Sequence, residues 1–215
     1  MLPVPRTHDP LAAGWVTGLF LLCLLVLAVV NRTAPRTWRI LFQAAFSMRL
    51  SKQTMREDVD LQDRNFLGLL LVSVIAIGMF VWQVAARGAG AGPAPYPLFV
   101  GSVLAVLLVQ GLLPRMVSVL IKADAGANEF LYTGSLLYAW LGLLLLPVTM
   151  LAAYHPEWHV WLVRTGAVFV LLTLLYRWVR GAWIGFGEGG FPGYIILYLC
   201  AAEIVPALLL VQALR

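Results

Sequence analysis

The chain has 215 residues, of which 61% are hydrophobic and 12% are charged. An ordinary globular domain is nearly half apolar and about a quarter charged, so this composition excludes a typical soluble protein and indicates a membrane protein. The net charge of +5 does not point to a nucleic-acid partner, because the basic residues stand beside apolar segments, where they orient helices and meet anionic lipid headgroups.

Six apolar runs are long enough to cross a bilayer as α-helices, which takes roughly 20 residues. They cover residues 11–30, 66–86, 97–121, 130–154, 160–180 and 194–214. We therefore expect an all-α fold, a polytopic transmembrane helix bundle of about six spans that forms a single membrane-embedded domain over residues 1–215. Continued to Lys122, the third run would be about 39 Å long as one helix, and Pro114 is where we expect it to bend or break.

The first connection between spans predicts an amphipathic helix that lies in the membrane interface over residues 37–52. Its apolar and polar side chains separate onto two faces at helical spacing. The apolar face holds Trp38, Leu41, Phe42, Ala45 and Met48, and the opposite face holds Arg39, Gln43, Arg49 and Lys52. The segment is too polar to span a bilayer and too apolar to lie in water, as is typical of interfacial helices. A direct continuation of the first span is disfavoured by Pro35, because the residue before a proline prefers extended backbone.

The basic residues of the connections predict the orientation of the chain. Seven of them lie in the first connection, and the third and fifth connections add Arg115, Lys122, Arg177 and Arg180. The opposite side holds Arg6, Arg87, Arg164 and Arg215. Since cytoplasmic connections carry the excess of positive charge, we expect the first, third and fifth connections in the cytoplasm and both termini on the other side of the membrane.

Two stretches near the C-terminus carry a family resemblance. They are residues 175–181, LYRWVRG, and residues 194–206, YIILYLCAAEIVP. Both resemble the closing signature of small polytopic membrane proteins of Bacteroidota, the domain-of-unknown-function family numbered 4271. The resemblance extends upstream to residues 128–130 and to the arginine-rich first connection. It implies a multi-helix protein of the bacterial inner membrane, whose termini would then be periplasmic, and it implies no particular activity.

Glu203 is the most informative single residue, because it lies about nine residues into the sixth run and so near the middle of the bilayer. A carboxylate at that depth is costly, so we expect it to face the bundle interior with a polar partner, or to be protonated. Arg177 is the first candidate partner. By helical spacing it shares one face of the fifth span with Gly166, Thr173 and Arg180, and the fifth and sixth spans, joined by a short turn, are expected to pack antiparallel.

Two interpretations are open for each of these polar residues. Arg177 and Arg180 either anchor the cytoplasmic end of the fifth span or reach into the bundle, and Glu203 either has a function or only fastens helices. Gln110 lies one turn before Pro114. It either bridges the backbone that this proline frees or lines a cavity, and we favour a role in fastening the structure. A stripe on the fourth span is assigned to helix packing and interface anchoring; it consists of Tyr132, Ser135 and Tyr138.

No pattern in the sequence indicates a catalytic residue, a bound cofactor or a metal site, so we do not expect an enzyme. We expect a non-enzymatic component of an envelope membrane complex, with the lipid bilayer and other envelope proteins as partners; the oligomeric state is left open. A first alternative is a small-solute or proton-coupled transporter that uses Glu203. A second is a lipid-headgroup enzyme at the cytoplasmic interface, for which Asp58, Asp60 and Asp63 would have to converge on one metal ion.

Overall fold

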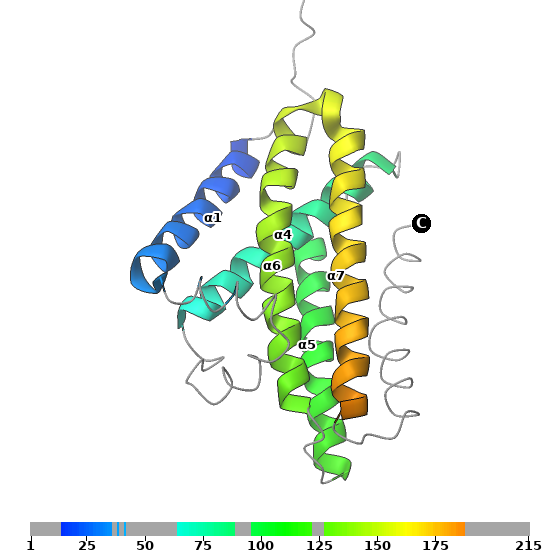
Figure 1. The fold of residues 1–215 in the computed structure, drawn as a ribbon. Helices are drawn as coiled ribbons and strands as arrows, with labels where there is room; N and C mark the ends of the chain where they lie inside the picture. Colours follow the sequence, from blue (N-terminus) through cyan, green and yellow to red (C-terminus); the bar gives the residue numbers. More distant parts are fainter. Residues whose placement is uncertain are drawn as a thin grey trace, which may run out of the picture.

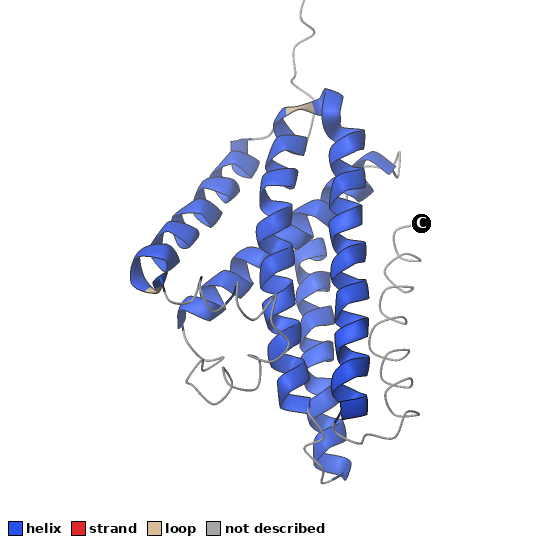
Figure 2. Ribbon diagram, viewed as in Figure 1, coloured by secondary structure: helices blue, strands red, loops and turns tan. Residues whose placement is uncertain are grey.

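The computed structural model describes residues 14–35, 38, 41, 64–88, 96–121 and 127–187. The elements of this part are helices α1 (Gly14–Thr33), α4 (Arg64–Gly88), α5 (Tyr96–Ile121), α6 (Ala127–Tyr154) and α7 (His159–Gly187), with the short 3-10 helix η2 (Pro156–Trp158) between α6 and α7 (Figure 1). Figure 2 shows helices and loops but no strand among the described residues. The expected all-α fold is confirmed for these residues. The predicted sixth span, residues 194–214, lies outside them.

Four of the described helices are long and apolar enough to cross a membrane. Their spanning parts are Gly14–Thr33 in α1, Asn65–Ala85 in α4, Leu131–Tyr154 in α6 and His159–Gly181 in α7. Each has at least 20 residues and so extends over about 30 Å or more, the thickness of the hydrocarbon core. The apolar stretch of α5, Tyr96–Leu112, is shorter and is not counted among these four. The described part of the chain is therefore that of a membrane protein, and the total of about six spans stays a prediction.

Two prolines were expected to limit helices, and the structure treats them differently. We expected a bend or a break at Pro114, and the structure excludes the break, because helix α5 continues through Pro114 from Tyr96 to Ile121. A proline removes one backbone donor, which a helix in a bundle tolerates when neighbouring groups satisfy the carbonyl left behind. Helix α1 ends at Thr33, two residues before Pro35. This end agrees with the preference for extended backbone before a proline.

Helix α4 lies at the centre of the described bundle, where it contacts α1, α5, α6 and α7. In Figure 1, α6 and α7 run side by side in opposite directions, joined through η2, and α4 crosses them obliquely. The most extensive contact is between α4 and α6. A buried cluster at this contact is formed by Phe66 and Leu69 of α4 with Leu136 and Ala139 of α6. The pair α4–α6 is therefore the core on which the other described helices pack.

Glycines on α6 and α7 let these helices approach α4 closely. A Cβ atom on Gly142 would lie 2.3 Å from the Cα of Ser73, and one on Gly166 would lie 2.3 Å from the ring of Phe80. Ser73 also joins the two core helices, because its hydroxyl lies 2.9 Å from the Leu69 carbonyl and 3.1 Å from the Ala139 carbonyl. Small residues at helix contacts are typical of membrane bundles, where close packing replaces the hydrophobic effect as the main source of association.

Two residues of the predicted interfacial helix are described, and both lie against the bundle. Leu41 is 1% exposed and belongs to the same buried cluster as Phe66 and Tyr132, with Trp38 packed beside it. The backbone carbonyl of Leu41 accepts a hydrogen bond from the Trp140 indole N–H of α6 at 2.9 Å. The rest of the segment 37–52 lies outside the described residues, so an interfacial helix there stays a prediction.

Candidate functional site

The polar stripe predicted on the fifth span lies on α7 and points into the protein. Arg177 is 5% exposed and Arg180 is 4% exposed, while Thr173 is partly buried. Both arginines are therefore buried, and Arg177 contacts neighbouring helices. Helical spacing explains this placement, because residues 166, 173, 177 and 180 recur on one face of a 3.6-residue helix. Gly166 lies on the same face, at the close approach to Phe80 described above.

Arg177 forms the centre of a buried polar cluster with Gln110 of α5 and Tyr138 of α6. Its Nη1 donates to Gln110 Oε1 at 3.0 Å, and the Tyr138 hydroxyl donates to the same oxygen. The Arg177 guanidinium carbon also lies 4.9 Å from the centre of the Tyr138 ring, within the range of a cation–π interaction. Gln110 is 6% exposed. In the part of the chain that the structure describes, one side-chain oxygen and one aromatic ring thus contact a buried positive charge, and the three side chains join three helices.

The backbone of α6 makes room for this cluster at Gly134. A Cβ atom there would lie 3.6 Å from the Arg177 guanidinium carbon, so a larger side chain would compete with the arginine for space. Two other stripe residues have described hydrogen bonds within α7. Thr173 donates to the Phe169 carbonyl at 2.8 Å, and Arg180 Nη1 donates to the Tyr176 hydroxyl at 3.5 Å. Of the predicted α7 residues, Arg177 is the one whose described hydrogen bond reaches another helix.

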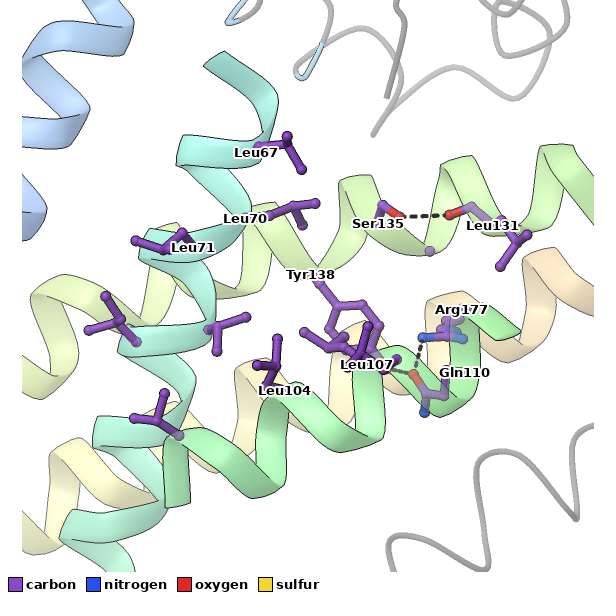
Figure 3. A pocket seen from close by; sticks show the side chains of 16 residues that line it. Leu67, Leu70, Leu71, Leu104, Leu107, Gln110, Leu131, Ser135, Tyr138 and Arg177 are labelled. Carbon is purple, nitrogen blue, oxygen red and sulfur yellow. Dashed lines mark hydrogen bonds between the residues drawn. The ribbon is translucent and has the colours of Figure 1, made fainter. Parts of the chain in front are cut away.

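The cluster borders a cavity of about 560 Å³ between α4, α5 and α6 (Figure 3). Its wall is formed mainly by aliphatic side chains, among them Leu70, Leu104 and Leu107, and Gln110, Tyr138 and Arg177 contribute polar groups at one end. A second cavity of about 220 Å³ lies beyond it, and Leu107, Tyr138 and Arg177 line both. An apolar cavity with a few convergent polar groups is the usual form of a small-molecule site.

Some of the predicted site could be found from the sequence and some could not. The helical spacing on the fifth span indicated the stripe, and Gln110 was recognised as an intramembrane amide. Tyr138 was assigned to packing, and its bond to Gln110 was missed, because helical spacing shows which residues share a face but not which faces meet. Glu203 and the acidic residues 57–63 lie outside the described residues, so the pairing of Glu203 with Arg177 stays a prediction.

Comparisons with known proteins give one result. Neither the curated proteins nor the solved structures contain a match to this chain. The model of one family, described as a domain of unknown function (DUF4271), matches residues 16–214, which is nearly the whole of the 215 residues. The resemblance seen in residues 175–181 and 194–206 is thereby confirmed. The chain belongs to the DUF4271 family of proteins, whose common domain has no assigned function.

Proposed function

We propose that this protein is a non-enzymatic component of a membrane complex in the bacterial envelope. It is embedded in the inner membrane as a multi-pass bundle with periplasmic termini, and its basic first connection is the surface on which a partner docks. The observation that carries the proposal is the attachment of this connection to the bundle at its base. A surface held in place by the bundle can bind a partner without a large cost of ordering.

The attachment uses residues on both sides of the connection. At its ends, the Thr33 hydroxyl of α1 lies 2.8 Å from the side-chain oxygen of Asn65 of α4. Further along, Leu41 is buried and its carbonyl accepts from the Trp140 indole. These contacts fix where the connection leaves the helices and where it returns.

The charge of the connection indicates the chemistry of the partner. Residues 32–64 hold seven of the 15 basic residues and four of the ten acidic residues, which gives this stretch a net charge of +3 out of +5 for the chain. A positive patch attracts an acidic partner surface and speeds its association. An acidic segment of another envelope protein is therefore the partner that this surface fits.

Charge removal in the connection tests the docking role. The full-length protein is purified from native membranes in mild detergent, and co-purifying proteins are quantified by mass spectrometry. We expect a protein partner that is retained by the wild type and lost from the triple variant Arg49→Gln, Lys52→Gln, Arg56→Gln. The matched control, with Arg87→Gln and Arg164→Gln at the opposite end, keeps the partner. The proposal is contradicted if no co-purifying protein increases in amount with the amount of wild-type protein that is purified.

A second candidate function, a proton-coupled or small-solute transporter, is favoured by the burial of Arg177 beside two cavities. Ionisable residues inside a membrane bundle often mark a transport pathway. The transporter function is tested with proteoliposomes that contain a pH-sensitive dye. Proton uptake into them is measured under an imposed membrane potential. We expect uptake that is lost in Glu203→Gln and kept in the exposed control Glu157→Gln; equal rates for wild-type and empty vesicles exclude this candidate.

A further inference from the structure

The larger cavity opens sideways, toward the lipid that surrounds the bundle. Four exposed leucines line it, Leu67 and Leu71 of α4 and Leu104 and Leu108 of α5, with between 47% and 57% of each side chain exposed. Each pair is four residues apart and so lies on one face of its helix. The two pairs form the rims of a lateral opening. When α4 and α5 are embedded in a bilayer, a molecule dissolved in the lipid can enter without crossing water.

The inner end of the cavity has a different chemistry from its mouth. Gln110 and Arg177 are at least nine-tenths buried, and together with Tyr138 they face the space that the leucines enclose (Figure 3). Arg177 brings a positive charge to this end. The cavity is therefore amphipathic, and it fits a molecule with a long apolar body and a small anionic end.

We propose that this cavity is a binding site for a fatty acid, with its chain along the leucines and its carboxylate against Arg177. A guanidinium and a carboxylate form strong charge-assisted hydrogen bonds. The volume of about 560 Å³ is within the range of small-molecule sites, about 300–1,000 Å³. It suits one hydrocarbon chain, whereas a phospholipid brings two chains and a glycerol headgroup.

The depth of Arg177 also selects a single-chain acid. Trp183, on the same helix, is 68% exposed, and tryptophan indoles prefer the membrane interface. Arg177 lies about 9 Å inward from Trp183 along α7, at 1.5 Å per residue. Phospholipid headgroups stay at the interface, but a compact carboxylate can follow the cavity inward to the guanidinium.

The energetics predict which part of the ligand gives selectivity. Lipid chains are as apolar as leucine side chains, so moving a hydrocarbon chain from the bilayer into the cavity changes its surroundings little. The carboxylate gains much more, because it meets a buried positive charge. Binding is therefore expected to discriminate strongly between an acid and its neutral ester and weakly between chains of similar length.

Competition between ligands tests this selectivity without any variant. The full-length protein is placed in phosphatidylcholine nanodiscs and bound to a dansyl-labelled fatty acid, whose fluorescence reports binding. We expect palmitate to displace this probe at concentrations about tenfold lower than methyl palmitate does. Equal displacement by the two competitors overturns the proposal. Stronger displacement by dipalmitoyl phosphatidylglycerol than by palmitate also overturns it, in favour of a phospholipid site.

Two glycines on α5 provide a matched pair of variants for the location of the site. A Cβ atom on Gly111 or on Gly101 would have no neighbouring atom within 4 Å. Gly111 lines the larger cavity, and Gly101 lines neither of the two cavities. We expect Gly111→Phe to fill the cavity and weaken probe binding about tenfold or more, while Gly101→Phe leaves it unchanged. Wild-type affinity in Gly111→Phe places the ligand elsewhere and overturns the proposal.

Variants of Arg177 test the carboxylate contact. We expect Arg177→Met to bind palmitate and methyl palmitate equally, because the charge that distinguishes them is gone, and Arg177→Lys to keep the preference for the acid. A preference that persists in Arg177→Met overturns the assignment of the carboxylate to this residue. If Arg177→Met does not fold, the wild-type competition and the glycine pair still decide the proposal.

Discussion

Gln110 joins three helices through one side-chain oxygen. A carbonyl oxygen has two lone pairs, and Gln110 Oε1 accepts from both the Tyr138 hydroxyl and Arg177 Nη1. We expect Gln110→Leu to lower the free energy of unfolding by about 1–3 kcal/mol, since one buried donor, on Arg177, and one partly buried donor, on Tyr138, lose this acceptor. Thermal unfolding in detergent, followed by tryptophan fluorescence, measures the loss as a lower Tm.

The matched variant Gln110→Glu keeps an acceptor oxygen of the same reach and adds a negative charge beside Arg177. We expect it to unfold at or above the wild-type Tm, because the guanidinium then bonds to a carboxylate in place of a neutral amide oxygen. If Gln110→Leu is as stable as the wild type, the cluster does not fasten the helices.

Tyr138 contributes both a hydroxyl and a ring to the same cluster, and two substitutions separate them. Tyr138→Phe removes the hydrogen bond to Gln110 but leaves the ring beside Arg177. We expect a loss of about 0.6 kcal/mol, the average for an interhelical hydrogen bond in a membrane. Tyr138→Leu also removes the cation–π contact, worth about 2 kcal/mol when desolvated, so its Tm should fall further. Equal Tm values for the two variants would show that the ring contributes nothing.

At the scale of elements, the contact between α4 and α6 depends on a position without a side chain. A methyl group on Gly142 would lie 2.3 Å from the Cα of Ser73, and a backbone atom cannot move aside as a flexible side chain can. We expect Gly142→Ala to separate the two helices and to destabilise the protein by about 1–3 kcal/mol, as overpacking does. The Tm in detergent measures the effect.

The control for this change is Gly101→Ala on α5, where a methyl group meets no atom within 4 Å. Alanine has a higher helix propensity than glycine, so Gly101→Ala is expected to leave the Tm unchanged or raise it slightly. A similar loss of stability in both variants would mean that Gly142 matters for its backbone and not for the close approach to Ser73.

Most ends of the five described helices could be predicted from the sequence to within about three residues. Five apolar runs coincide with α1, α4, α5, α6 and α7, because the thickness of a bilayer sets the length of a span. The largest difference lies at the end of α7, where no proline stops the helix beyond the apolar run. The fifth run was expected to end at residue 180, but α7 continues to Gly187, and nothing in residues 181–187 removes a backbone donor.

The contacts between elements could not be predicted in the same way. Periodicity placed Arg177 and Thr173 on one face of α7, but the partner of that face depends on how the helices are arranged around α4. Gln110 and Tyr138 lie on two other helices, and no local pattern relates them to residue 177. The cavity could not be predicted for the same reason, since its walls are formed by side chains that meet only after the helices pack.

At the scale of the whole molecule, exposed tryptophans on α7 fit the thickness of a bilayer. Trp161 is 69% exposed and Trp183 is 68% exposed, and they are separated by about 33 Å along the helix axis. The hydrocarbon core is about 30 Å thick, and indole rings prefer its two boundaries. Helix α7 can therefore cross the membrane with one tryptophan at each interface.

The orientation of the molecule across that membrane follows from its charges. The connection between α6 and α7 carries exposed Glu157, and the basic first connection lies at the other end of the predicted spans. Because positive connections stay in the cytoplasm, we expect position 157 in the periplasm and position 52 in the cytoplasm.

The chain has two cysteines, Cys23 and Cys200, so replacing both with serine gives a background for single-cysteine labelling. The outer membrane of the cells is made permeable, and a maleimide that cannot cross the inner membrane is added. It should label Glu157→Cys and spare Lys52→Cys. After lysis it should label both. The reverse pattern in unlysed cells would invert the topology, and it would place the proposed docking surface on the periplasmic side.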